Sequence, residues 1–359
     1  MDRAQCFPKT SGDAMSDQWP KVAIIILNWN GWRDTIECLE SVEALTYPNY
    51  EVILVDNGSV DDSVARIREW VMGRPERWGP AQHLPEGVAA ILPAGAQVAL
   101  GTERLTLIRS DENLGFAGGC NLAIDFALAR DPSIGFVFLL NNDAQVEPGC
   151  LTACVAAAQN SGAGIAGAVL KSKKTGEVVF AGSHFPLELF IAAHVRRFPR
   201  SDTWWRVDRT MGAAMLVRRE LLEARKARLG YIFDPDLFAY CEELELCIWA
   251  AHLGHAVVMV RDAVVYHRGA GSTGGPYNPV AYYYLTRNRI RLAKILLPAA
   301  LRILFHVWYA PTRVGRALQL AVLKNFGAAR AILEGLVDGY VGSGGRWHRH
   351  DSWLERTPK

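Results

Sequence analysis

The sequence lacks several features that assign many chains to a class at once. No stretch reaches about 18 uninterrupted apolar residues, because the nearest candidate, 295–310, is broken by Pro298, Arg302 and His306. We therefore expect no transmembrane helix. The seven cysteines contain no C-x-x-C pair, and residues 1–20 are polar and do not resemble a secretory signal. These absences predict a cytoplasmic, reduced protein without disulfides or a cysteine-based zinc site.

The chain carries little net charge, but the charge is unevenly distributed. A formal net charge of +2 gives no reason to expect nucleic acid as a partner. Residues 287–359, however, contain 13 Lys or Arg and 4 Asp or Glu among many apolar residues. This composition is typical of contact with anionic lipid or a phosphate-bearing partner, and equally of a solvated basic surface.

Buried strands alternate with amphipathic helices in the first part of the chain. Residues 22–27 (VAIIIL) form a continuous apolar run, typical of a strand covered on both faces of a parallel sheet. A helix capped by Asp34 or Thr35 follows, and then a second strand at 51–55. This β-α-β-α order predicts an α/β fold whose ligand site lies at the carboxyl ends of the strands.

Three regions are expected from composition and pattern. Residues 1–20 are predicted to be a disordered leader, and residues 21–281 the main α/β domain. Within that domain, residues 72–103 are rich in Gly, Pro and Ala and are predicted to be a long loop or insertion. Residues 282–359 are predicted to form a helical, basic C-terminal region, because apolar residues recur there at helical spacing.

Acidic and imidazole side chains follow several of the predicted strands. Asp56 can accept a hydrogen bond from the imide N–H of a uracil or thymine ring. Asp143 is a hard oxygen ligand suited to Mg²⁺ or Mn²⁺ on a diphosphate, and His267 can complete that site. Glu242 and Glu243 are adjacent, so the charge of one carboxylate can raise the pKa of the other toward the range of a general base. Each signal alone is also typical of a helix terminus or, for the histidine, of a structural role.

Two glycine-rich segments lie near these residues. The segment 113–119 (NLGFAGG) follows a strand and precedes a helix, where a phosphate or sugar can approach, although tight packing also explains it. The segment 269–275 suits a mobile loop over a diphosphate. The turn after the first strand, NWNG, lacks G-x-G-x-x-G, which disfavours a Rossmann dehydrogenase. It also lacks the glycine-rich, basic loop expected of a nucleotidyltransferase.

Taken in order, these segments resemble family 2 glycosyltransferases, especially the bacterial rhamnosyltransferase-like branch. The resemblance covers about residues 22–290. It is carried by IIILNWNGWRDTIECLESV, VILVDNGSVDDS, NLGFAGGCNLAI, FVFLLNND, GAAMLVRRE, FDPDLFAYCEELELCIWAAHLGH and VVYHRGAGSTG. It implies a GT-A fold, a Rossmann-like mixed and mostly parallel sheet flanked by helices, with residues 21–281 as the catalytic domain.

The resemblance also implies roles for individual residues. Glu243, next to Glu242, is the expected general base, at a position where the family usually has Asp. Asp143 and His267 are the expected ligands of a divalent cation, Mn²⁺ or Mg²⁺. The expected donor-binding residues are Asn28, Asn30, Asp56, Asn57, Asn113, Gly115, Phe116, Asn142 and Asp143.

The implied activity is inverting transfer of a sugar from a UDP- or dTDP-type donor to a saccharide or polyprenol-linked acceptor in cell-surface polysaccharide synthesis. L-Rhamnose is the sugar of this branch, and galactose, N-acetylglucosamine and mannose stay open. The alternative is a catalytically degenerate nucleotide-sugar-binding protein, because Asn141 and Glu243 depart from the family's usual residues. The C-terminal region is expected to contact the inner face of the cell membrane. Packing on the catalytic domain, or a homodimer, is the other interpretation.

Overall fold

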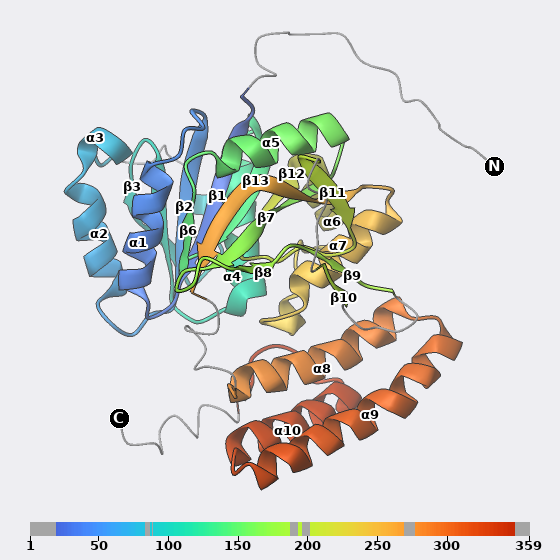
Figure 1. The fold of residues 1–359 in the computed structure, drawn as a ribbon. Coiled ribbons are helices and arrows are strands. Elements are labelled where there is room, and N and C mark those ends of the chain that lie inside the picture. The colour runs from blue at the N-terminus through green and yellow to red at the C-terminus, as the bar shows by residue number, and fades with distance from the viewer. Residues whose placement is uncertain are drawn as a thin grey trace.

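The computed structural model describes residues 19–82, 87, 89–186, 193–195, 202–268 and 277–348. A mixed sheet forms the centre, helices flank it, and three C-terminal helices lie together beside it (Figure 1). The strands are β1 (Lys21–Asn28), β2 (Tyr50–Asn57), β3 (Ala96–Gly101), β4 (Leu105–Ser110), β5 (Ile134–Asn141), β6 (Ala144–Val146), β7 (Ile165–Ser172), β8 (Val178–Phe180), β9 (Ser183–His184), β10 (Ala193–His194), β11 (Trp204–Val207), β12 (Ala214–Arg218) and β13 (Val257–His267).

The helices alternate with these strands over the first half of the chain. They are α1 (Trp32–Glu43), α2 (Ser63–Met72), α3 (Pro75–Trp78), η1 (Ala89–Ile91), α4 (Gly115–Arg130), α5 (Cys150–Ser161), α6 (Arg219–Leu229), η2 (Pro235–Leu237), α7 (Glu242–His252), α8 (Pro279–Leu296), α9 (Ala299–Val322) and α10 (Phe326–Val341).

The order of strands along the sheet is β11-β13-β7-β12-β5-β1-β2-β4-β3. Strands β5, β1, β2 and β4 are parallel, and β12 is antiparallel to both β5 and β7. The apolar run of β1 is buried because α4 packs on β1 and β2 and further strands pair on either side. The predicted fold class, a mixed and mostly parallel sheet flanked by helices with a helical C-terminal region, is confirmed.

Several local expectations need correction. The segment 72–103 is not simply a loop, since its described part contains α3, η1 and the antiparallel edge strand β3. Helix α1 begins at Trp32 after Gly31, and no side chain caps it. The predicted cap Thr35 instead lies inside the helix, where its hydroxyl donates to Asn28 Oδ1 over 2.8 Å. The predicted leader and the glycine-rich segment 269–275 lie outside the described residues, except for Trp19 and Pro20.

The C-terminal helices share a hydrophobic core with the main domain. Leu244 and Ile248 of α7 belong to the same buried cluster as Ile290 of α8 and Leu320 of α9. Helix α10 approaches α8 closely at Gly335, where an added Cβ would lie 2.7 Å from the Tyr283 carbonyl oxygen. The bundle is therefore joined to the sheet domain through α7.

Candidate active site

The carboxyl ends of β1 and β2 place the predicted nucleotide-binding residues side by side. Asn28 lies opposite Asp56 in the parallel register, and its Nδ2 donates to Asp56 Oδ2 over 2.7 Å. The other carboxylate oxygen of Asp56 accepts from the Ser59 backbone N–H at 3.1 Å. Both Asn28 and Asp56 have no exposed surface. The predicted nucleobase ligand is thus at the expected edge, but its carboxylate is covered and already engaged.

Asn30 ties the loops after β1 and β2 together. Its Oδ1 accepts from the Val60 N–H at 2.9 Å, and its own N–H donates to the Ser59 hydroxyl at 2.8 Å. Asn30 adopts a left-handed backbone with φ 51°, which asparagine tolerates better than most residues. This side chain therefore shapes the loops that surround Asp56.

The glycine-rich segment 113–119 forms the start of α4 and packs tightly. Asn57 Nδ2 donates to Asn113 Oδ1 at 3.2 Å and to the Gly115 carbonyl at 2.9 Å. Gly115 has φ +72°, and a Cβ there would lie 2.3 Å from the Phe238 carbonyl oxygen. Only glycine suits both conditions. In the described structure this segment joins β2 to the turn before α7.

Asp143 and His267 meet at the ends of β5 and β13. His267 Nε2 lies 3.0 Å from Asp143 Oδ1, and Asn141 Nδ2 lies 3.3 Å from the same ring nitrogen. Asp143 Oδ2 is buried and has no hydrogen-bond partner among the described residues. A cavity of about 170 Å³ opens here, lined by Ile25, Leu27, Phe116, Cys120, Leu139, Leu140, Asn141, Asn142 and Asp143. A larger groove, beside α2, contains none of the predicted site residues.

The donor set fits a divalent cation shared with a ligand. A carboxylate with one unpartnered oxygen suits Mn²⁺ or Mg²⁺, and a neutral imidazole beside it can add a nitrogen ligand. Within the described residues, no group of three or more His, Cys, Asp or Glu side chains gathers to hold a metal. Asp143 and His267 would therefore supply two protein ligands to such a cation. Asn142 Nδ2 donates to Thr35 Oγ1 at 3.1 Å, which holds it beside this pair.

The acidic pair begins α7. Glu243 Oε1 accepts from Arg209 Nη2 at 2.5 Å and from Arg209 Nε at 3.2 Å. Its Oε2 accepts no hydrogen bond from the residues described in the structure. Glu242 is buried, and its Oε2 has no partner there. Burial, and then the charge of Glu243, raise the pKa of Glu242 well above its ordinary value.

Phe116 connects the two halves of the site. Its ring lines the cavity at Asp143 and lies beside Gly212, where an added Cβ would be 3.3 Å from it. Gly212 is also near Glu243, since the same added Cβ would lie 3.7 Å from Glu243 Cβ. Phe116 thus lines the cavity that holds Asp143, and Gly212 lies between this ring and the predicted base, Glu243.

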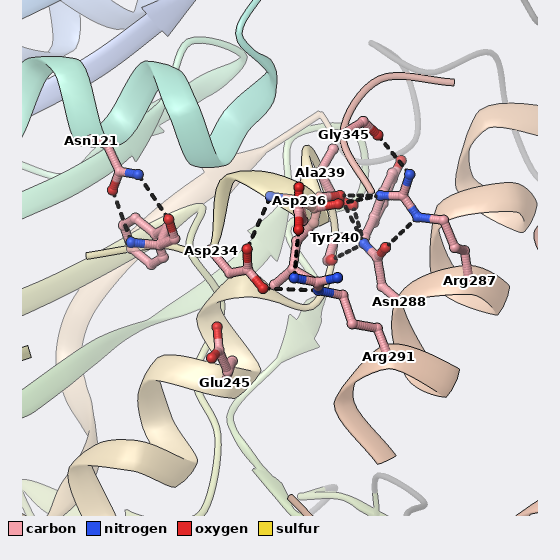
Figure 2. Close-up of polar contacts among 12 residues, drawn as sticks. Asn121, Asp234, Asp236, Ala239, Tyr240, Glu245, Arg287, Asn288, Arg291 and Gly345 are labelled. Carbon is pink, nitrogen blue, oxygen red and sulfur yellow. Dashed lines mark hydrogen bonds and ion pairs between the residues drawn. The ribbon is translucent and has the colours of Figure 1, made fainter. Parts of the chain in front are cut away.

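The turn before α7 has an unusual backbone. Phe238, Tyr240 and Cys241 have φ values of 59°, 68° and 76°, a region that costs non-glycine residues roughly 1–2 kcal/mol each. Asn288 of α8 holds this turn. Its Nδ2 lies 2.9, 2.8 and 2.7 Å from the carbonyl oxygens of Leu237, Ala239 and Tyr240 (Figure 2).

Two arginines on either side of Asn288 complete this clamp. Arg287 Nη2 donates to the Asp236 and Leu237 carbonyls at 2.7 and 2.9 Å. Arg291 forms ion pairs with Asp234 at 2.9 Å and Asp236 at 2.6 Å (Figure 2). Helix α8 therefore fixes the backbone that leads directly into Glu242.

Sequence reasoning missed three parts of this arrangement. Arg209, the partner of Glu243, and Asn288, the partner of the turn, carry no local signal of their role. Asn141 was treated as a departure from an acidic motif, yet its amide contacts His267. Spacing along the chain does not reveal any of these contacts, because the partners are 34 or more residues apart.

Comparison with known families agrees with this arrangement of strands and side chains. A model described as glycosyltransferase like family 2 matches residues 85–279, more than half of the chain. A second, glycosyl transferase family 2, matches residues 23–92. The chain belongs to glycosyltransferase family 2. Together the two matches span the elements from β1 to the start of α8.

Known proteins of similar sequence or structure are distant. The chain is 26% identical over 270 residues to the uncharacterized protein y4gI of Sinorhizobium fredii, covering 72% of this chain but about a quarter (26%) of that protein. The mannosyltransferase PcManGT of Pyrobaculum calidifontis, solved with GDP-Man and Mn²⁺, superposes with TM-score 0.54 and 17% identity over 89% of this chain and 87% of its own. S. aureus TarS matches with TM-score 0.49 and 15% identity, over 79% of this chain and 41% of its own. The P. calidifontis likeness shows that this family 2 chain has the GT-A fold.

Proposed function

We propose that the chain transfers a sugar from a nucleoside-diphosphate donor to an acceptor hydroxyl with inversion at the anomeric carbon. The observation that carries this proposal is a cavity lined by Phe116 and Asp143, with His267 3.0 Å from Asp143 and with Gly212 between Phe116 and Glu243, in a family 2 chain. The acceptor oxygen forms a bond to the anomeric carbon as the bond from that carbon to the diphosphate oxygen breaks. The nucleoside diphosphate leaves, and the hydroxyl proton goes to a carboxylate.

Glu243 is the proposed base. Arg209 holds its Oε1, which orients the carboxylate and leaves Oε2 to accept the proton. Glu242 is the less suitable group, because its carboxyl is buried and its raised pKa favours the protonated form. Its proposed role is to line the site next to the base.

Asp143 and His267 are the proposed ligands of Mn²⁺ or Mg²⁺. A bound cation would offset the negative charge that develops on the departing diphosphate. The chain's part is to present the unpartnered Asp143 Oδ2 and the imidazole Nε2 together at the cavity, next to Asn142. Asn28, Asn30, Asp56, Asn57, Asn113 and Gly115 are proposed to shape the donor pocket, mainly by holding its loops.

The test compares two single variants with matched controls. Glu243→Gln should abolish transfer and keep donor binding, whereas Glu223→Gln, an exposed change on α6, should leave both intact. Asp143→Asn should weaken cation-dependent nucleotide binding at least tenfold, and Asp262→Asn, at an exposed position of β13, should not. Transfer retained in Glu243→Gln would refute the base assignment. Nucleotide binding unchanged in Asp143→Asn would remove that residue from the cation site.

The donor is proposed to be a UDP- or dTDP-linked sugar, with L-rhamnose first and galactose, N-acetylglucosamine and mannose as the other candidates. GDP belongs in the same screen, because the P. calidifontis structure contains GDP-Man. Thermal shifts with UDP, dTDP and GDP, each with and without Mn²⁺, identify the nucleobase of the donor, since a ligand that binds the folded state raises the melting temperature of the protein. Stabilisation by none of them would favour the degenerate binding protein.

The acceptor is proposed to be a saccharide, free or polyprenol-linked, used in cell-surface polysaccharide synthesis at the inner membrane face. No described helix is both long and apolar enough to cross a membrane. Helix α9 does carry an exposed apolar stripe, made of Ile303, Leu304, Val307, Val314, Leu318 and Val322. Residues 297–333 include five Lys or Arg and no Asp or Glu, so an anionic membrane is the proposed partner of this stripe.

Liposomes test this contact directly. The protein should sediment with vesicles that contain anionic phospholipid at low salt, and Leu318→Glu with Val322→Glu should release it. Exposed Val178→Glu with Val179→Glu, on β8, serve as the matched control. Failure to sediment, together with a homodimer in solution that the α9 substitutions dissociate, would assign the stripe to self-association instead.

A further inference from the structure

A cluster of three arginines on α8 and α9 takes no part in the contacts described so far. Arg289 is on α8, and Arg313 and Arg316 are on α9. Arg316 Nη2 donates to the Tyr282 hydroxyl at 2.8 Å, and the Arg313 guanidinium lies 5.3 Å from the Tyr309 ring centre. Arg289 is seven positions after Tyr282, and Arg313 is four positions after Tyr309, so each pair shares one side of its helix.

These arginines differ from the others on the same helix. Arg287 and Arg291 use their guanidinium groups to hold the turn before α7. None of Arg289, Arg313 and Arg316, by contrast, forms an ion pair with a carboxylate in the described part of the chain. Arg313 Nε is buried there and lacks a hydrogen-bond partner. Three half-buried cations without a carboxylate partner make a positively charged site that favours an anion, although Arg316 also donates to Gln319 Oε1 at 2.6 Å.

The cluster lies near the turn before α7, because Tyr309 belongs to one buried hydrophobic cluster with Cys241 of that turn. Tyr309 joins the two helices, since its hydroxyl donates to the Leu285 carbonyl at 3.3 Å. Burial raises the pKa of Tyr309, and the charges of Arg289 and Arg313 oppose that rise. Burial and Glu243 likewise raise the pKa of Cys241, and Arg289 opposes this.

We propose that Arg289, Arg313 and Arg316 bind the phosphate or diphosphate group of the acceptor substrate. Arginine suits this task because its planar group offers several N–H donors to phosphate oxygens. The cluster faces away from the apolar stripe of α9, since Arg313 and Arg316 are rotated from Val314 and Leu318 around the helix. A lipid-linked acceptor could thus keep its chain at the membrane and its diphosphate near Glu243. This assignment rests on the proposed function for its link to transfer.

The test measures binding to the full chain without donor and with EDTA present, so that any cation-dependent binding of diphosphate at Asp143 is suppressed. The probes are farnesyl diphosphate and inorganic pyrophosphate. We expect farnesyl diphosphate to bind the wild type, and Kd to rise about tenfold for each of Arg289→Gln and Arg313→Gln, the loss expected for one charged hydrogen bond. Arg289→Lys should recover part of the affinity. Lys324→Gln, which removes the same charge from an exposed position, should change Kd less than twofold.

Each outcome separates the alternatives. Equal binding of pyrophosphate and farnesyl diphosphate, both lost with Arg289→Gln, would uphold the phosphate site and refute its lipid-linked source. No binding to the wild type, or unchanged Kd in a folded Arg289→Gln protein, would overturn the site. Glu243→Gln should bind the probe normally. If the wild type bound farnesyl diphosphate but showed no cation-dependent nucleotide binding, the proposed function would be refuted and the arginine site would stand.

Discussion

Replacing Asn288 by alanine tests whether α8 supports the turn before α7. The amide of Asn288 is the donor for three carbonyl oxygens, those of Leu237, Ala239 and Tyr240. Leu237 keeps a second donor, Arg287. The substitution therefore removes the Asn288 donor from the Ala239 and Tyr240 carbonyls. An unsatisfied buried group costs about 1–3 kcal/mol, and both residues are only partly buried, so we expect a loss of about 2–3 kcal/mol in unfolding free energy.

The same substitution should reduce transfer. In the wild type, Phe238, Tyr240 and Cys241 keep left-handed backbones next to the acidic pair, held by the hydrogen bonds from Asn288. Without these bonds the turn can relax and move the acidic pair. We expect kcat to fall at least tenfold while cation-dependent nucleotide binding stays intact, because Asp143 lies on another element. Guanidinium unfolding and a transfer assay measure the two effects.

Asn160→Ala is the matched control, since Asn160 is exposed on α5. It should change the unfolding free energy by less than about 0.5 kcal/mol. If Asn288→Ala were as stable as Asn160→Ala, the hydrogen-bond argument would be wrong. A destabilised Asn288→Ala protein with full turnover would refute the link between the clamp and the base.

Three further predictions follow from buried groups. Gly115→Ala should destabilise the folded protein by more than about 2 kcal/mol, because it combines a left-handed backbone with a Cβ 2.3 Å from the Phe238 carbonyl oxygen. Gly149→Ala, where the added Cβ meets open space, should be tolerated. Thermal unfolding of both variants checks this. Arg225→Met should lower the unfolding free energy by about 3–5 kcal/mol, because it leaves Glu245 buried without its partner at 2.8 Å. Adding Glu245→Leu to this variant should recover much of that loss, as measured by chemical unfolding. Burial and Glu243 raise the folded-state pKa of Glu242, so the folded state binds its proton more tightly than the unfolded chain and stability falls as pH rises above the unfolded pKa of about 4.3. Glu242→Gln should therefore be stabilising relative to the wild type near pH 7 and lose that advantage toward pH 4, in melts across this range; a constant difference would contradict the argument.

The fold could be predicted largely because its central strands are apolar on both faces. The runs that became β1 and β2 admit little except burial in a parallel sheet, and their carboxyl ends place Asn28 beside Asp56. Strand β3 was missed because AQVALG is short, rich in Ala and Gly, and only partly buried at a sheet edge.

The candidate site was predictable in position and less so in its contacts. Asp143 and His267 lie at the ends of strands whose pairing the sequence does not reveal, yet they meet at 3.0 Å. Arg209 and Asn288 resemble ordinary surface residues in sequence, and only their distant partners show what they do. The covered carboxylate of Asp56 was also unexpected, since burial of a strand end depends on the loops that close over it. The roles assigned to these residues stay predictions.

Helix α8 makes the sheet domain depend on the C-terminal bundle in evolution as well as in the folded structure. Its residues 287, 288 and 291 hold the turn that precedes Glu242, while its other side belongs to the C-terminal bundle. A chain that ended before this helix would carry every motif of the sheet domain and still lack the support of its acidic pair. A C-terminal bundle exchanged by recombination between relatives must therefore bring an equivalent clamp with it.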